Sequence, residues 1–217
     1  MTVGSADAIS KSHLFRVAFW LGIFTIGYNL VEGVVATLLG YQDETIALFG
    51  FGVDSFIEMI SGIGIVYMVL RIERQPNSLR SDFERTALRI TGASFYVLVA
   101  GMLVSAFVSV YLGKTPETTF WGIIISVVSI VVMMFLLVSK LKVGRQLQSE
   151  AILADAGCTR VCIYMSCLLL ASSGIYYLTS FPYADALGTL GLAWFSYREG
   201  KECFEKARSE KLCHCDH

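Results

Sequence analysis

The sequence has few of the residues that mark a soluble or nucleic-acid-binding protein. It contains three prolines and three histidines in 217 residues, and charged residues amount to only 16% of the chain. The formal net charge of −1 gives no electrostatic basis for binding nucleic acid. Residues 1–12 are polar and the apolar run after them is longer than a signal-peptide core, so we expect no cleavable leader. No low-complexity segment or Gly/Ser-rich linker interrupts the chain.

What the chain has instead is hydrophobicity gathered into long runs. It is 55% hydrophobic, and its mean hydropathy is +0.62. A helix needs about 20 apolar residues to cross the ~30 Å hydrocarbon core, and in lipid each backbone group must be paired within its own segment. We therefore predict an all-α membrane protein with six transmembrane helices, of which the sixth has the weakest signal. The expected spans are 14–39, 46–70, 87–112, 119–138, 151–178 and 184–197.

Basic residues alternate between the loops of this predicted bundle. Of the 17 Lys and Arg residues, the N-terminus, the 71–89 loop, the 140–145 linker and the tail hold all but two. Lys114 lies in an opposite loop and Arg160 lies inside the fifth run. The positive-inside rule then places both termini in the cytoplasm, which requires an even number of spans. This divides the chain into a cytoplasmic N-terminus (1–13), a membrane domain (14–199) and a short tail (200–217).

Two acids interrupt the second run and two thiols interrupt the fifth. Asp54 and Glu58 are four residues apart, as are Cys158 and Cys162, so each pair shares one helical face. An acid in a span costs ~2.5–3.5 kcal/mol on insertion scales, which indicates a function. At 1.5 Å per residue, Asp54 and Glu58 lie ~12 and ~18 Å from the outer side, and Cys162 and Cys158 lie ~10 and ~16 Å from it. The spacing therefore predicts a four-ligand metal site near the middle of the bilayer.

The ligand types restrict the ion. Mixed oxygen and sulfur donors suit a tetrahedral ion such as Zn²⁺ or Cd²⁺, whereas Mg²⁺ and Ca²⁺ prefer shells of oxygen alone. Carboxyl and thiol ligands must lose their protons to bind, so metal uptake releases protons and can be coupled to a proton gradient. We expect Zn²⁺ as the transported ion, with Cd²⁺, Co²⁺ or Fe²⁺ as alternatives, and no organic cofactor.

Other polar residues within the runs have either auxiliary or structural roles. Glu32, with Asn29 one helical turn before it, is a proton relay, an auxiliary ligand or a packing hydrogen bonder. Asp155 is a second candidate for an auxiliary or relay role, although Asp155 and Arg160 can equally pair with partners at helix–helix contacts. The sequence leaves these alternatives open.

All six cysteines lie in the last third of the chain, which favours metal handling over a disulfide framework. We expect Cys167 to be a small packing residue. The tail, with Cys203 nearby, either captures soft metals or is a casual surface cluster. Its candidate ligands are Cys213, His214, Cys215 and His217.

The paired motifs resemble those of the cation diffusion facilitator family, in a compact branch without the cytoplasmic C-terminal domain. "TIALFGFGVDSFIE" places Asp54 and Glu58 at the ligand positions of the second helix, and "SEAILADAGCTRVC" places Cys158 and Cys162 at those of the fifth. "YNLVEGVVA" and "YADALGTLGLAWFSYREG" also look like this branch. The resemblance implies transport rather than catalysis, and a homodimer formed here by membrane helices, with the third-span segment "GASFYVLVAGMLVSA" as the contact. Glu58 and both thiols depart from the family's usual Asp and His ligands.

We therefore predict a proton-coupled exporter of a divalent transition metal, with zinc as the first choice, spanning a bacterial cytoplasmic membrane several times. Two alternatives from other classes remain. One is a membrane thiol–disulfide oxidoreductase that uses Cys158 and Cys162, although such an enzyme leaves the acids unexplained. The other is a metal-sensing membrane protein that transports nothing.

Overall fold

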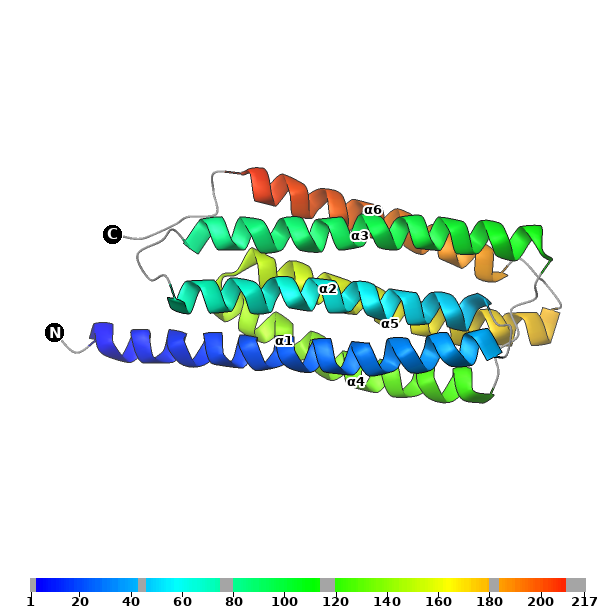
Figure 1. Cartoon of the computed structure of the whole chain (residues 1–217), viewed down its shortest axis with the longest axis horizontal. Helices are drawn as coiled ribbons and strands as arrows, with labels where there is room; N and C mark the ends of the chain where they lie inside the picture. The colour runs from blue at the N-terminus through cyan, green and yellow to red at the C-terminus, as the bar shows by residue number, and fades with distance from the viewer. Residues whose placement is uncertain (1–2, 43–45, 75–79, 114–119, 180–183, 210–217) are drawn as a thin grey trace.

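The computed structural model describes residues 3–42, 46–74, 80–113, 120–179 and 184–209, and these contain helices and no strand. The helices are α1 (Val3–Gln42), α2 (Ile46–Arg74), α3 (Arg80–Tyr111), α4 (Phe120–Leu147), α5 (Glu150–Thr179) and α6 (Ala184–Arg208). Consecutive helices run antiparallel along one long bundle (Figure 1). The prediction of an all-α membrane protein is confirmed.

Five of the described helices, α1 to α5, contain windows long and apolar enough to cross a membrane. Helix α6 is not among them, because its second half is charged. It also ends at Arg208, beyond the expected end at residue 197. Helix α1 begins before the expected span, and α4 continues past residue 138 to Leu147. Apolar runs mark where a helix meets lipid, so they give its membrane part and not its two ends.

Helices α2 and α5 occupy the interior of the bundle. More than half of the apolar window of each is buried, against under a third for α1, α3 and α4. Helix α1 packs mainly against α2, α3 against α6, and α4 against α5, and α2 and α5 also contact each other. The two helices that carry the predicted ligands are therefore the two whose side chains are most shielded from lipid.

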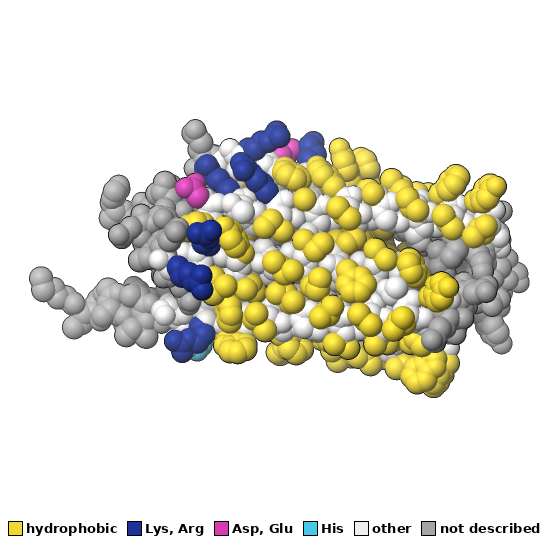
Figure 2. Space-filling model, viewed as in Figure 1, with side chains coloured by type: hydrophobic (Ala, Val, Ile, Leu, Met, Phe, Trp, Pro, Cys, Tyr) yellow, Lys and Arg dark blue, Asp and Glu magenta, His cyan; other side chains and the backbone are white. Residues whose placement is uncertain are grey.

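The surface separates into an apolar body and a basic end (Figure 2). Basic residues lie in the last turns of α2, α4 and α6, namely Arg71, Arg74, Arg145, Lys206 and Arg208. These turns lie at the same end of the bundle as the start of α1 (Figure 1). We call this the basic end, and the orientation that places it in the cytoplasm stays a prediction.

Close contact between α1 and α2 depends on glycine. A Cβ on Gly52 would lie 2.7 Å from the backbone nitrogen of Thr37 and 3.0 Å from the carbonyl oxygen of Gly33. Atoms do not approach this closely, so only glycine permits the crossing. The crossing precedes Asp54 by two residues on α2 and therefore fixes the position of that carboxylate relative to α1.

Helices α4 and α5 are joined by a two-residue turn. Gln148 adopts a left-handed backbone with φ of 49°. The N–H of Ser149 donates to the carbonyl of Gly144 at 3.0 Å and that of Gln148 donates to the carbonyl of Arg145 at 3.2 Å, which is the Schellman pattern of a helix end. The Ser149 hydroxyl then accepts from the N–H of Ile152 at 3.5 Å and caps α5. This short turn holds α4 and α5 together as an antiparallel pair.

Candidate metal transport site

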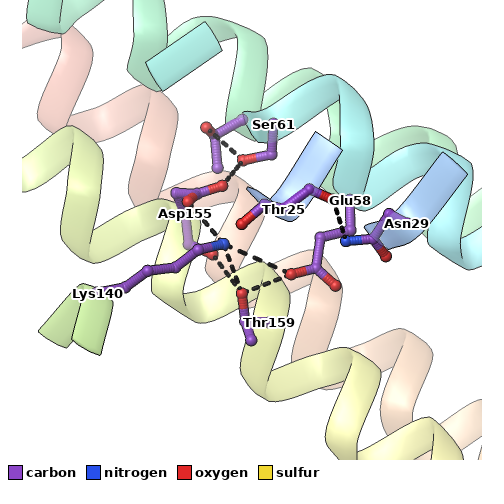
Figure 3. A network of polar contacts seen from close by, with 8 residues as sticks. Thr25, Asn29, Glu58, Ser61, Lys140, Asp155 and Thr159 are labelled. Carbon is purple, nitrogen blue, oxygen red and sulfur yellow. Dashed lines mark hydrogen bonds and ion pairs between the residues drawn. The ribbon is translucent and has the colours of Figure 1, made fainter. Parts of the chain in front are cut away.

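A buried lysine on α4 is the centre of a polar network that joins α2, α4 and α5 (Figure 3). The Nζ atom of Lys140 lies 2.8 Å from Oδ2 of Asp155 and 3.6 Å from Oε1 of Glu58, and all three side chains are 2% exposed. Nζ also donates a hydrogen bond of 2.8 Å to Oγ1 of Thr159. Its charge is therefore compensated by acids from two other helices, as a buried cation requires.

The sequence-based assignment of Lys140 to a cytoplasmic linker at 140–145 is wrong. Helix α4 continues to Leu147, and Lys140 points inward, one helical turn after buried Leu136 and two turns after buried Met133. A hydropathy count assigns any charge at the end of an apolar run to a loop, which is the cause of the error. The helical spacing of positions 133, 136, 140 and 143 would instead have placed Lys140 on the inward face of the helix. The other basic residues still outnumber Lys114, so the predicted orientation is unaffected.

Asp155 is fully occupied by this network. Its Oδ1 accepts a hydrogen bond from Ser61 Oγ at 2.7 Å, and its Oδ2 faces Lys140. Ser61 is in turn 3.0 Å from the hydroxyl of Thr91 on α3. The geometry favours the structural alternative for Asp155, since it ties four helices together and leaves neither oxygen free.

The two acids of α2 have free oxygens that face the interior. Asp54 and Glu58 are 3% and 2% exposed, yet Oδ2 of Asp54 and Oε2 of Glu58 have no hydrogen-bond partner among the described residues. Oε1 of Glu58 accepts a 2.5 Å hydrogen bond from Thr159. Buried carboxylate oxygens without donors are rare in folded proteins because they are costly, and a bound cation would satisfy both.

The two thiols of α5 face different neighbours. Cys162 is fully buried and within side-chain interaction distance of both Asp54 and Glu58. Cys158 lies near Ser61, which follows Glu58 by three residues on α2, and Thr159 donates a hydrogen bond to Glu58. Both thiols therefore lie on the side of α5 that faces α2, about 6 Å apart along the helix axis. In the described part of the chain no three ligand-type side chains are close enough to hold an ion in this conformation.

Glu32 and Asn29 connect α1 to this region. Glu32 accepts hydrogen bonds from Tyr28 at 2.9 Å and from Ser55 of α2 at 3.0 Å. Asn29 donates to the carbonyl of Thr25 at 3.0 Å, and its own Oδ1 has no partner among the described residues. Both oxygens of Glu32 thus have hydrogen-bond partners, and one partner, Ser55, is the residue that follows Asp54 on α2. This arrangement supports a packing role for Glu32 more directly than a role in metal binding.

A cavity of about 990 Å³ reaches Asp54 from the end opposite the basic end. Its walls are mostly apolar and come from the end of α1, the start of α2, and α3, α5 and α6; they include Tyr41, Phe49 and Leu169. Asp54 is the only carboxylate among the residues that line this cavity. An ion that enters here would meet a free oxygen of Asp54 before it meets Glu58.

The remaining candidates lie away from the network. Arg160 is 40% exposed, 3.9 Å from Glu199 of α6, with its guanidinium 5.9 Å from the ring centre of Phe195. Cys203 is buried on α6, and Cys167 is exposed on α5. The four tail candidates, Cys213, His214, Cys215 and His217, lie outside the described residues.

The fold and these side chains define a multi-pass membrane protein with buried, unsatisfied acids on an interior helix. Residues 21–210 match the cation efflux transmembrane domain. The chain therefore belongs to the cation efflux family, which transports metal cations across membranes, and the expected family membership is confirmed. The match covers α2 and α5 with all four predicted ligands. No match was found among curated proteins.

Proposed function

We propose that this protein exports a divalent transition metal, with Zn²⁺ as the main cargo, in exchange for protons across a bacterial cytoplasmic membrane. The observation that carries the proposal is the pair of free, buried oxygens on Asp54 and Glu58 beside the thiol of Cys162. Carboxylate and thiolate together favour Zn²⁺ or Cd²⁺ over hard ions. Because these ligands must be deprotonated to bind, loading the metal displaces protons and release of the metal takes them up.

The proposed ligand set is Asp54, Glu58, Cys158 and Cys162, although no three of these side chains are close enough to hold an ion in the present conformation. Asp54 and Glu58 are the neighbours of Cys162, so a small movement of α5 against α2 would bring these three onto one ion, whereas Cys158, about 6 Å away along the α5 axis, would need a larger one. A transporter has to change its coordination in order to bind and release cargo, and a fourth ligand that joins in only one state provides such a change. The cavity beside Asp54 supplies access from the non-basic end.

We also propose a homodimer formed through α3. In the small-residue segment 92–106 of α3, Gly92 already packs against α6 of the same chain, since a Cβ there would lie 2.9 Å from the Phe204 ring. Gly101 is exposed, and a Cβ there would meet nothing within 4 Å. Gly101 also lines the cavity beside Asp54, so a second copy that packs closely against this α3 face would form part of the cavity wall.

Proteoliposomes containing the purified chain and a pH-sensitive dye, with a zinc-sensitive dye in parallel samples, test the transport proposal. We expect Asp54→Asn and Cys162→Ser each to abolish zinc-driven proton movement, and Cys158→Ser to reduce it less. Cys167→Ser, at an exposed thiol on the same helix, is the matched control and should behave as wild type. If the Asp54→Asn variant and the Cys162→Ser variant each keep the flux of the wild type, the cargo binds elsewhere.

The oxidoreductase alternative has no supporting observation in the site. Cys158 and Cys162 are free thiols that face different neighbours, and the chain belongs to a family of transporters.

A further inference from the structure

The polar network already contains a cation. The ammonium of Lys140 lies 3.6 Å from Oε1 of Glu58, the same carboxylate whose Oε2 is free for cargo. Asp155 alone, at 2.8 Å, would neutralise the lysine, and Thr159 supplies a further hydrogen-bond partner. The approach to Glu58 is therefore an additional contact that the ion pair with Asp155 does not require.

Two cations on one carboxylate repel each other, and burial strengthens the repulsion because little water screens it. A zinc ion bound at Oε2 of Glu58 would lie close to the Lys140 ammonium across a single carboxylate. The ammonium cannot diffuse away, since its chain is anchored in α4 and all three of its partners come from α2 and α5. It therefore acts on every ion that enters the site.

We propose that Lys140 is a tethered competitor for the cargo metal: its ammonium holds one oxygen of Glu58 and weakens metal binding, so that the ion is released rather than retained. This inference rests on the proposed function, because it assumes that Glu58 is a ligand. Lys140 touches no cargo in this scheme and is a positioning residue. Removing its charge should tighten metal binding, whereas a purely structural lesion would weaken it.

Equilibrium zinc binding to the purified full-length chain in detergent, measured by competition with a chromophoric chelator, tests the inference. The variant Lys140→Met/Asp155→Asn removes the ammonium and its main partner together, so that Asp155 is not left as a buried charge without its lysine. We expect it to bind zinc about tenfold or more tightly than wild type and to release it correspondingly more slowly. Lys140→Arg keeps the charge and should bind as wild type does.

Lys142→Met is the matched control, since Lys142 is exposed on the same helix, and its affinity should not change. Unchanged or weaker zinc binding in a double variant that melts cooperatively would overturn the inference while leaving the transport proposal intact. If neither the wild type nor the double variant binds zinc, the proposed function itself fails. Lys140→Gln/Asp155→Asn carries the same expectation should the methionine variant fail to fold.

Discussion

The buried pair of Lys140 and Asp155 leads to a prediction about stability that does not depend on cargo. Replacing Lys140 by Met leaves Oδ2 of Asp155 without its 2.8 Å partner in a position that is 2% exposed. Removing one member of a buried ion pair costs about 3–5 kcal/mol, because the other charge remains desolvated. We expect Lys140→Met and Asp155→Asn each to destabilise the protein by about this amount.

The double variant should be far less damaging than either single variant. Replacing both members of a buried ion pair by groups of similar volume is often neutral or stabilising. In Lys140→Met/Asp155→Asn, the hydroxyl of Ser61 can still donate to the amide oxygen at position 155, and Thr159 can still donate to Glu58, as both do in the present structure. The loss in the double variant should therefore fall short of the sum of the two single losses by several kcal/mol, by more than one whole single-variant cost.

Unfolding by SDS titration or by heat in detergent micelles, followed by circular dichroism, measures this double-mutant cycle. Lys142→Met, at an exposed position of α4, provides the baseline and should change stability by less than about 0.5 kcal/mol. Additive losses would refute the reasoning, because they would mean that Lys140 and Asp155 stabilise the fold independently of each other.

Three further changes test the supporting structure. Gly52→Ala should cost about 1–3 kcal/mol and weaken zinc binding, since the new methyl group separates α1 from α2; thermal melts and chelator competition measure both effects. Gln148→Gly should raise the melting temperature slightly, because φ of 49° is unfavourable for a residue with a side chain. Burial lowers the pKa of Lys206, but hydrogen bonds and charges from Glu150 and Glu202, each 2.8 Å away, raise it overall. These two contacts stabilise the fold by at most about 1 kcal/mol, and this stabilisation is complete below the ordinary lysine pKa and lost as the pH rises through the raised pKa. The melting temperatures of wild type and Lys206→Met should therefore converge above the raised pKa.

Each of these changes has a control in the same chain. Gly27→Ala adds a methyl group to α1 where nothing lies within 4 Å and should not lower the melting temperature. Gln146→Gly introduces glycine in the regular helix of α4 and should lower stability by about 0.5–1 kcal/mol, opposite in sign to Gln148→Gly. Lys201→Met removes an exposed lysine whose ion pair is with Glu205 of the same helix, and it should show a smaller effect than Lys206→Met. If a control variant changes stability as much as its test variant does, the contact proposed for that test variant is not the cause of the effect.

The sequence predicts the membrane helices well because lipid imposes a simple rule on composition. A span must be about 20 apolar residues long, so the cores of α1 to α5 can be found by counting. Helix α6 has a weaker signal because its membrane part is short and its second half is charged. The fact that Asp54 and Glu58 share an inward face also follows from sequence, since helical spacing fixes it.

Helix rotation and the partners of buried charges are not contained in the spacing of residues. A rise of 1.5 Å per residue estimates the depth of Cys158 and Cys162, but it does not give the angle at which α5 faces α2. The angle is set by packing against α4 and by the bonds of Thr159 to Glu58 and Lys140. For the same reason the sequence count placed Lys140 in a loop, since only the bundle shows that Asp155 and Glu58 lie opposite it.

The site lies between helix pairs that are each held together by local features. Helix α1 is fixed to α2 by the close approach at Gly52, and α4 is fixed to α5 by the turn at Gln148. Glu58 belongs to the first pair, whereas Lys140 and Cys162 belong to the second, so the distances among ammonium, carboxylate and thiol depend on how the two pairs are placed. If Glu58 and Cys162 bind cargo as proposed, a movement of one pair against the other would change metal coordination and the competing charge at the same time, which is the coupling that alternating access requires.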